Sequence, residues 1–371
     1  MYYFDHSATT PIHNDVLYLM NEIQRDIYGN PSSVHQLGRK ARSTIETARK
    51  QVAKSIGAET NQIIFTSGGT ESNNHVLWSR LGKKNSHVIT NQIEHPAVLK
   101  VLKHLSTSGL EHDLISVDDK GYVSLDEIEL TISEKTGLIS IMLANNEVGT
   151  IQPIQKIVGI ANQQEVLVHT DAVQCLGKMP LNVVELGIDF LSLSAHKFYG
   201  PKGIGILFVK DNSLLSSFII GAGQENNLRA GTENIASIAG MGLAAELATS
   251  ALESHIQHLT KLETQFKIGL NSFFKDAIFN GDSENKLPGL LSISFPGFRS
   301  DILMAKLDRA NMAVSSGSAC GSGNVKPSTI LSAMGIDDET NISTIRISFG
   351  SSNTSLEVDL LLAELKSVLS N

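Results

Sequence analysis

The sequence has little cysteine and more acidic than basic residues, and both features exclude classes of protein. Only 2 cysteines occur among 371 residues, too few for a disulfide framework or a zinc-ribbon protein. The 38 acidic and 30 basic side chains give a formal charge of −8. This balance argues against a nucleic-acid binder, because phosphate neutralisation needs clustered Lys and Arg. The length predicts one large domain, or a large domain with a smaller one.

No segment predicts a signal peptide or a membrane span. The first ten residues, MYYFDHSATT, contain no basic stretch followed by an apolar one. The most apolar window, Ile235–Leu252, is interrupted by Gly240, Gly242 and Glu246, and would cross a bilayer only at a cost. We therefore expect a cytoplasmic protein that binds neither a membrane nor nucleic acid directly.

Short apolar runs alternate with stretches of helical period. Runs that are apolar on both faces indicate strands of a mainly parallel sheet flanked by helices. The predicted strands are Ile63–Phe65, His87–Thr90, Leu138–Ala144, Val166–His169, Phe190–Leu193 and Ile204–Val209. The predicted helices are Ser43–Ile56, Glu71–Arg80, Pro96–Ser108, Pro153–Gln163 and Thr232–His258. Ten residues separate the last two strands, too few for a helical crossover, so this edge of the sheet should be antiparallel.

The character of the sequence changes near residue 252, where the charge rises. The later segments predict a smaller α+β domain. Its expected elements are a helix over Leu262–Asp276, a strand over Leu290–Phe295, a helix near Ser300–Ala310, a Ser/Gly-rich stretch and a strand over Thr344–Phe349.

A glycine-containing segment, Thr66–Asn74, follows a β-branched strand and opens a helix. The consecutive glycines Gly68 and Gly69 would expose backbone N–H groups to an anion at the positive end of that helix. The alternative is an ordinary helix cap provided by Thr70 or Ser72. The segment alone does not decide between a phosphate cradle and a cap.

Two further groups of polar residues follow predicted strands, at the carboxyl ends where ligands sit in doubly wound sheets. Asp171 could pair with a cationic ring nitrogen there, although a capping aspartate is the more common case. Lys197 follows an apolar strand, so the pKa of its amine should lie below the reference value of ~10.4, which would make the amine nucleophilic. A lone lysine at a strand end is usually solvated, but Ser194, His196 and Lys197 together before a Gly-Pro-Lys-Gly turn are less ordinary.

Phosphate cradle, strand-end aspartate and strand-end lysine occur in an order that resembles a fold-type I pyridoxal-phosphate enzyme of the class V aminotransferase group. More closely, the chain resembles the NifS/IscS-type cysteine desulfurases, almost from end to end. The segments that carry the resemblance are Tyr3–Pro11, Gly29–His35, Glu94–Val98, Asn145–Gln152, Arg229–Asn234 and Ser315–Cys320. Several long motifs in this order are far more specific than any one of them.

The resemblance implies an α/β fold with a mainly parallel seven-stranded sheet in a large domain and a smaller α+β domain. The large domain would span residues 14–252 and bind pyridoxal 5'-phosphate. The small domain would combine residues 1–13 and 253–371 and carry the catalytic-cysteine loop, at about 315–327.

The resemblance also implies roles for individual residues. Lys197 would bind the cofactor covalently, Asp171 would keep its ring nitrogen protonated, and His95 would stack on the ring and take part in catalysis. The remaining cofactor contacts would come from Asn146 and Gln174 at the ring oxygen and from Gly69, Thr70, Ser194 and His196 at the phosphate.

Two more residues would act on the substrate and across a dimer. Arg346, with Asn146, would hold the substrate carboxylate, for which a planar guanidinium fork is better suited than a lysine. Without the resemblance, a surface ion pair would be the simpler explanation of Arg346. Thr232 would complete the phosphate site of a neighbouring subunit, which implies a homodimer.

The two cysteines receive different predictions. Cys320 lies in Ser315–Gly323, where the other eight residues are Ser, Gly or Ala, and such a stretch should form a mobile loop. A buried, inert cysteine is the usual alternative, but this context argues against it. A free thiol with a pKa of ~8.5 would need some activation to react at neutral pH. Cys175 lies between apolar residues and is predicted to be a small core side chain.

The implied activity is that of a cysteine desulfurase, which converts L-cysteine to L-alanine and transfers the sulfur to Cys320 as a persulfide. An acceptor protein of iron–sulfur cluster assembly or thiolation would then receive the sulfur. A selenocysteine lyase or another class V lyase or transaminase is the nearest alternative. A non-catalytic sulfur carrier or scaffold subunit is the alternative of a different class. No metal site is expected.

Overall fold

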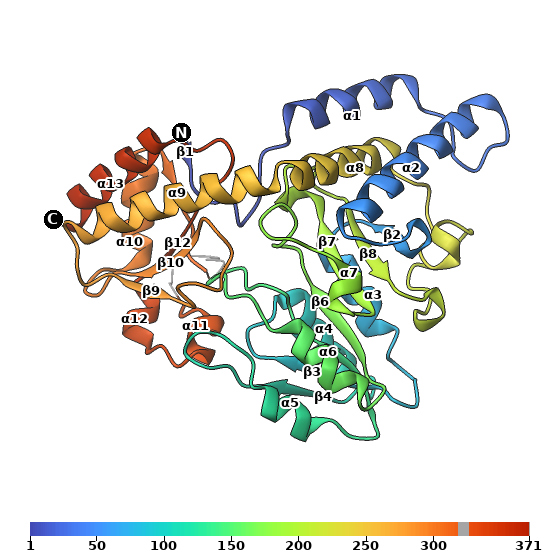
Figure 1. Cartoon of the computed structure of the whole chain (residues 1–371), viewed down its shortest axis with the longest axis horizontal. Coiled ribbons are helices and arrows are strands. Elements are labelled where there is room, and N and C mark those ends of the chain that lie inside the picture. The colour runs from blue at the N-terminus through green and yellow to red at the C-terminus, as the bar shows by residue number, and fades with distance from the viewer. Residues whose placement is uncertain (318–325, 371) are drawn as a thin grey trace.

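A seven-stranded sheet forms the centre of the larger part of the molecule, on the right in Figure 1. The computed structural model describes residues 1–317 and 326–370. The strand order is β2-β8-β7-β6-β5-β3-β4. The strands are β2 (Ile63–Thr66), β3 (His87–Asn91), β4 (His112–Ile115), β5 (Thr136–Ser140), β6 (Leu167–Asp171), β7 (Phe190–Ser194) and β8 (Gly205–Val209). All neighbouring pairs are parallel except the two that β8 makes, so the prediction of a mainly parallel seven-stranded sheet is confirmed.

The prediction of an antiparallel edge was right about the pairing and wrong about the position. Strands β7 and β8 pair antiparallel, from Phe190 opposite Val209 to Ser194 opposite Gly205. However, β2 pairs with the other side of β8 and is itself the edge strand. Because every residue of β8 is buried, the strand is suited to a position between two neighbours.

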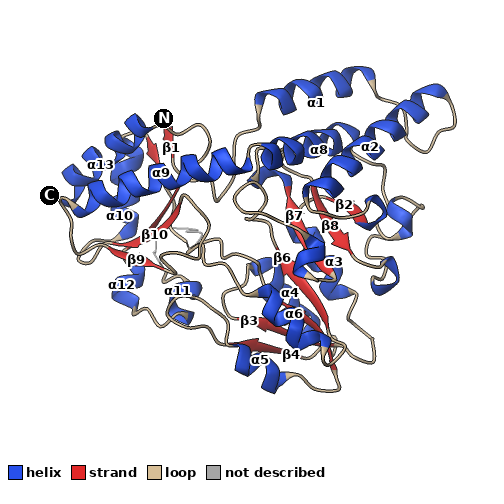
Figure 2. Cartoon of the chain, in the orientation of Figure 1, coloured by secondary structure: helices blue, strands red, loops and turns tan. Residues whose placement is uncertain are grey.

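Helices cover both faces of this sheet (Figure 2). The helices of this part of the chain are α1 (Asn14–Asp26), α2 (Gln36–Ser55), α3 (Gly69–Trp78), α4 (Pro96–Ser106), α5 (Leu125–Thr131), α6 (Ile154–Asn162), α7 (Val183–Leu186) and α8 (Ile235–Ser250). Successive strand residues face opposite sides. Accordingly, Ile63 and Phe65 belong to one hydrophobic cluster, with α2 and α6, and Ile64 belongs to another, with α3 and α4.

The remaining residues form a second layered unit around a three-stranded antiparallel sheet, β12-β10-β9. Its elements are α9 (Leu252–Asn271), β9 (Ile278–Asn280), β10 (Leu290–Ser294), α10 (Ser300–Arg309), β11 (Met312–Ala313), α11 (Thr329–Ala333), α12 (Asp338–Ile342), β12 (Thr344–Ser348) and α13 (Ser355–Leu369). The N-terminal strand β1 (Tyr2–Tyr3) pairs with β11, and Phe4 joins the cluster of Phe266, Ile293 and Leu361. The predicted domain boundary at residue 252 stays a prediction.

The long helix predicted over Thr232–His258 is in fact two helices. Helix α8 ends at Ser250, α9 begins at Leu252, and the two are bent by 71°. The buried face of α8 packs on α1 and α2, whereas α9 packs on α13, so each half follows its own cluster. Among the described helices, none alone is long and apolar enough to cross a membrane, and the bent pair reaches that length and composition only together.

Candidate active site

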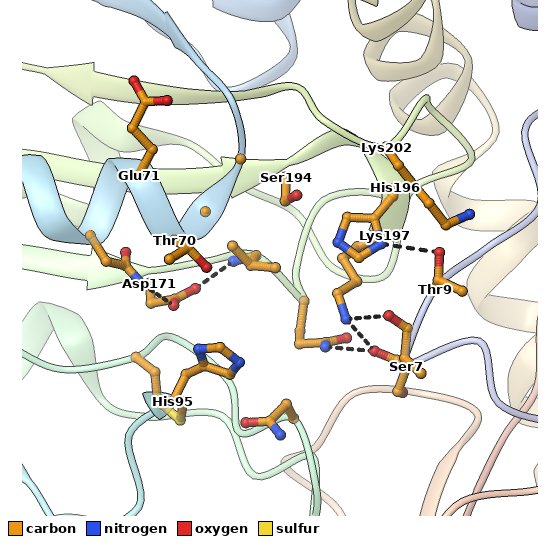
Figure 3. A pocket seen from close by; sticks show the side chains of 18 of the residues that line it. Ser7, Thr9, Thr70, Glu71, His95, Asp171, Ser194, His196, Lys197 and Lys202 are labelled. Atoms are coloured by element: carbon orange, nitrogen blue, oxygen red, sulfur yellow. Dashed lines mark hydrogen bonds between the residues drawn. The ribbon is translucent and has the colours of Figure 1, made fainter. Parts of the chain in front are cut away.

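A cavity of about 620 Å³ lies at the carboxyl ends of the central strands (Figure 3). Ten of the residues predicted to bind cofactor or substrate line it. They are Gly69, Thr70, His95, Asn146, Asp171, Gln174, Ser194, His196, Lys197 and Arg346. Asp171 and Ser194 are the last residues of β6 and β7, and Gly69 begins the helix that follows β2. Since the carboxyl ends of parallel strands meet at one edge of a sheet, the topology brings these residues together.

The start of α3 forms an open backbone cradle. Gly68 is the N-cap residue, with φ +150°, and no side chain caps the helix. Ser72 lies inside the helix and donates to the carbonyls of Gly68 and Ile206, so it is not the cap considered as an alternative. The first N–H groups of an α-helix lack intrahelical partners and carry partial positive charge. This end of α3, beside Thr70, is therefore suited to an anion.

The carboxylate of Asp171 is buried and fixed in orientation. The side-chain amide of Asn73 donates to its Oδ2 at 2.6 Å, and the backbone N–H of Val173 donates to its Oδ1 at 3.0 Å. Figure 3 shows this carboxylate beside the imidazole of His95. A carboxylate held in this way can accept one further hydrogen bond from a cationic ring nitrogen in the cavity.

The amine of Lys197 points to the N-terminal segment of the chain (Figure 3). It donates to the carbonyl oxygen of Ser7 at 2.6 Å and to that of Ala8 at 2.8 Å. Burial lowers the pKa of Lys197 to about 7, with smaller contributions in the same direction from Lys178 and Arg346. A substantial fraction of this amine is therefore neutral at neutral pH, as a nucleophile or proton acceptor requires.

Two histidines complete the polar wall. Burial lowers the pKa of His196 to about 4, and its Nδ1 lies 3.1 Å from the hydroxyl of Thr9. His95 is the N-cap residue of α4, and its Nδ1 accepts from the backbone N–H of Ala97 at 3.1 Å. Desolvation lowers the pKa of His95 against the opposing charge of Asp171, which favours a neutral imidazole for stacking on a flat ring.

Arg346 lies in the middle of β12 and is buried, which is not the surface ion pair considered as an alternative. Its Nη2 donates to Oδ1 of Asp5 at 2.8 Å, and its Nη1 donates to the carbonyl oxygen of Asn146 at 3.0 Å. Its Nε has no partner in the described part of the chain, although it is buried. The guanidinium is thus held in place at the border of the cavity, and these two contacts use only two of its five N–H donors.

These observations provide a test of whether pyridoxal phosphate fits the site. Asn146 lines the cavity, and its side-chain oxygen is buried without a partner in residues 1–317 and 326–370. Buried polar atoms are rarely left unpaired, so a ligand with a donor group would satisfy it. An anion cradle, a fixed carboxylate and a depressed lysine pKa around one cavity match the phosphate, ring nitrogen and aldehyde of that cofactor. The residues present therefore fit the group.

One predicted residue lies elsewhere, and another is outside the part of the chain that the structure describes. Thr232 does not line the main cavity but a smaller neighbouring one, which shares Ser67 and Gly203 with it. Cys320 lies outside the described residues. Cys175, the other cysteine, is fully buried as predicted, and burial raises the pKa of its thiol.

Several residues at the site were not singled out from the sequence. Asn73 orients Asp171, the carbonyls of Ser7 and Ala8 hold Lys197, and Asp5 holds Arg346. The motif Tyr3–Pro11, which carries part of the resemblance, contains Asp5, Ser7 and Ala8 and is the sequence signal for these three residues. It could not reveal that backbone oxygens bind the lysine, because any residue type supplies a carbonyl.

Comparison with known proteins gives the family. The model of the class V aminotransferase family matches residues 2–361. The chain belongs to the class V aminotransferase family. Within this family, it is 42% identical over 370 residues to a protein named cysteine desulfurase IscS from Dictyoglomus turgidum, covering 99% of this chain and 94% of that protein. A protein of the same name from Methanosarcina thermophila is 41% identical, covering 97% of this chain and 90% of that protein.

Solved structures of class V aminotransferase relatives agree with the fold. A structure titled NifS-like protein superposes with a TM-score of 0.94 at 40% identity and covers 100% of this chain and 99% of that one. A structure titled SspA in complex with cysteine has a TM-score of 0.83 at 34% identity, covering 95% of this chain and 100% of the other. The fold is therefore that of the NifS-like members of the family.

Proposed function

We propose that this chain is a pyridoxal-phosphate-dependent cysteine desulfurase, which converts L-cysteine to L-alanine and transfers the sulfur to Cys320. The observation that carries the proposal is one cavity that Lys197, Asp171 and Arg346 line together. An amino acid needs one group for its carboxylate and one for its Cα proton, and this cavity supplies both. The names of the relatives, cysteine desulfurase IscS among them, support cysteine as the substrate.

The cofactor-binding residues would be those that line the cavity. The N-terminus of α3 at Gly69 and Thr70, with Ser194 and His196, would bind the phosphate. Asp171 would accept from the ring nitrogen, His95 would stack on the ring, and Lys197 would bind the cofactor covalently. When bound, pyridoxal phosphate supplies an electron sink for the negative charge that develops at the substrate Cα. Asn146 and Gln174 would contact the ring oxygen.

The chain's own groups would then act in a fixed order. Arg346 binds the carboxylate of L-cysteine and orients the substrate, with Asn146 beside it. Lys197, as the neutral amine, removes the Cα proton. The thiolate of Cys320 attacks the substrate sulfur, so the carbon–sulfur bond breaks and a sulfur–sulfur bond forms. Protonation of Cβ, which lost the sulfur, and return of a proton to Cα release alanine, and Cys320 is left as the persulfide, which balances all atoms.

The proposal includes a homodimer in which Thr232 reaches the neighbouring subunit's phosphate site. Large apolar side chains are exposed on α1 and the segment after it: Tyr18 is 66%, Tyr28 73% and Val34 88% accessible. Ile220, near the Thr232 segment, is 89% accessible. Contiguous exposed apolar patches mark association surfaces, so these side chains are candidates for the subunit interface. A cytoplasmic location and a sulfur-acceptor protein, of iron–sulfur assembly or thiolation, belong to the same proposal.

The test compares the two cysteines as a matched pair. We expect Cys320→Ala to reduce alanine formation from L-cysteine by roughly a hundredfold or more, because it removes a nucleophile. Cys175→Ala, which removes a buried thiol, should retain activity and persulfide formation. Full activity of the Cys320→Ala enzyme would rule out thiol transfer. Comparison of selenocysteine with cysteine as substrate separates a selenocysteine lyase.

A second measurement separates an enzyme from a sulfur carrier. The purified chain should bind pyridoxal phosphate with a visible absorption band that is lost in Lys197→Ala. A chain that cannot be loaded with the cofactor would contradict the enzyme proposal. Labelled cysteine, followed to the copurifying protein that receives the label, would identify the acceptor.

A further inference from the structure

A second cavity, of about 220 Å³, lies behind Lys197, between the turn after β6 and the junction of α8 with α9. Lys178, Tyr199 and His255 line it together with Lys197. Since Lys197 also lines the larger cavity, the two cavities are neighbours at this residue. A charge on a residue of the second cavity can therefore act on the amine of Lys197.

The buried cation in this second cavity is Lys178. Its ammonium donates to Oε1 of Gln174 at 3.2 Å, and no carboxylate of the described chain forms an ion pair with it. Burial lowers the pKa of Lys178 to about 8, so most of it is still charged at pH 7. A buried charge without a counter-charge destabilises a fold, so stabilisation does not explain this residue.

A short hydrogen-bonded path joins the two lysines. The amide nitrogen of Gln174 donates to the carbonyl oxygen of Ser7 at 3.0 Å, and the same oxygen accepts from Lys197 at 2.6 Å. Lys178 therefore fixes the amide of Gln174, which borders the site that Lys197 also borders. In a poorly solvated region, the charge of Lys178 acts on Lys197 with little screening.

We propose that Lys178 is a positioning residue of the active site, whose buried charge acts together with burial to favour the neutral form of Lys197 and whose hydrogen bond orients Gln174. The inference rests on the proposed function in taking Lys197 as the lysine that binds the cofactor and moves the proton. It assigns a role in that site to a residue that does not line the substrate cavity.

The other groups that face the two lysines are accounted for. Besides Lys178, Lys197 faces one cation, Arg346, and two carboxylates, Asp5 and Asp171. It also faces the imidazoles of His95 and His196. Lys178 faces His6, His255, Cys175 and Arg346. Burial lowers the pKa of both His6 and His255 to about 4, and burial raises that of Cys175. All three are neutral at pH 7, so Lys178 and Arg346 supply the positive charge and the carboxylates oppose it.

The experiment measures the protonation of Lys197 directly. In the cofactor-free full chain, the rate at which acetic anhydride labels Lys197 is followed against pH by mass spectrometry, with an expected midpoint near 7. Lys178→Met should raise this midpoint by on the order of one pH unit, which reduces labelling at pH 7 by about fivefold. In the cofactor-loaded chain, the pH midpoint of the visible band should rise in the same direction.

Matched variants separate charge from packing. Lys178→Arg retains the charge and should keep the wild-type midpoint, whereas Lys178→Gln can donate to Gln174 without a charge and should behave like Lys178→Met. Lys210→Met, at an exposed lysine paired with Asp189, should change nothing. An unchanged midpoint in both uncharged variants would overturn the proposal. So would a large loss of unfolding free energy in Lys178→Met, since that would show a structural role.

The labelling midpoint and the activity of Cys320→Ala together show whether the role of Lys178 or the proposed function is wrong. If the midpoint shifts as expected and Cys320→Ala retains activity, the electrostatic role stands and sulfur transfer is wrong. If sulfur transfer depends on Cys320 and the midpoint does not shift, the role of Lys178 is wrong and the desulfurase proposal stands.

Discussion

At the scale of single residues, burial is the main cause of the unusual acid–base properties around the cavity. It lowers the pKa values of Lys197, Lys178 and His196, and it raises that of Glu94, the residue before His95. Groups with shifted pKa values gather at functional sites because charge must be removed from water there to act on a substrate. The same burial makes these residues sensitive to pH in ways that ordinary surface residues are not.

Glu94 gives a prediction about stability. Its Oε1 accepts from the backbone N–H of Met142 at 2.6 Å and from the amide of Asn91 at 2.7 Å, while its buried Oε2 has no partner in the described residues. Burial raises its pKa well above 4.5. The folded chain therefore binds more protons than the unfolded chain at and above pH 4.5, and the free energy of unfolding should fall as pH rises.

The substitution Glu94→Gln removes this dependence while keeping an oxygen for the two donors. We expect the stability of the variant relative to wild type to increase with pH above about 4.5, by up to about 1.4 kcal/mol per pH unit. Urea denaturation at a series of pH values measures the difference. A difference that is constant with pH would show that Glu94 is ionised in the folded chain as easily as in the unfolded one.

At the scale of elements, a buried ion pair fixes the segment that leads to Thr232. Arg49 of α2 donates to both carboxylate oxygens of Glu225, at 2.7 and 2.9 Å, and the backbone N–H of Phe65 donates to the same carboxylate. Glu225, Asn226 and Asn227 all have positive φ, between 46° and 64°. Three such residues in succession store strain that the surroundings must offset, and the ion pair is the contact that anchors them.

We expect Arg49→Met to reduce the free energy of unfolding by about 3–5 kcal/mol, because it leaves the Glu225 carboxylate buried and unpaired. Lys50→Met is the control on the same helix. Lys50 is exposed to solvent, so its replacement should change the free energy of unfolding by at most about 0.5 kcal/mol. Chemical denaturation of both variants measures this, and equal effects would contradict the importance assigned to the buried pair.

The sequence predicted the strands whose residues are all buried. Strands β2, β7 and β8 are buried at every position, so their continuous apolar runs were recognisable. Strand β4 was missed because it is an edge strand with partly exposed residues, including Leu114 at 43%. The break at Ala251 was missed because neither Gly nor Pro marks it. There the bend follows from packing on two clusters, which sequence periodicity does not record.

At the candidate site, too, some residues were predicted from the sequence and others were not. Side chains with distinctive chemistry, such as Lys197, Asp171 and Arg346, were predicted and do line one cavity. The groups that position them were not predicted, because they are backbone carbonyls or amides such as Asn73. Lys178 was also missed, since its importance depends on the absence of a carboxylate around it, and a sequence pattern does not contain that information.

At the scale of the whole molecule, residues from two sheets line the active-site cavity. Arg346 belongs to the C-terminal sheet, while the cradle, Asp171 and Lys197 belong to the central sheet. The backbone of Arg346 also pairs with Ser315, at 2.6 and 3.1 Å, where the Ser/Gly-rich stretch begins. The proposed carboxylate-binding residue therefore connects both sheets and the segment that contains Cys320.

The proposed homodimer can be tested by subunit complementation. If Thr232 serves the neighbouring subunit, Lys197→Ala and Thr232→Ala chains that are inactive or weak alone should recover activity when mixed and allowed to exchange. About a quarter of all sites would then be intact, one in each mixed dimer. Activity after mixing, with size measured in parallel, checks this. Absence of recovery in dimers shown to be mixed would place Thr232 in its own subunit's site.

The N-terminal segment has a practical consequence for the production of this protein. Within ten residues it adds β1 to the C-terminal unit, contributes Phe4 to that core, and provides the carbonyls that hold Lys197. A polypeptide that started at Met20 would still contain most of the buried residues of the central sheet and of the C-terminal unit. Such a shortened polypeptide would lack the acceptors of the lysine amine, and its expression level would say nothing about its activity. Affinity tags are therefore better fused after α13 than before Tyr2.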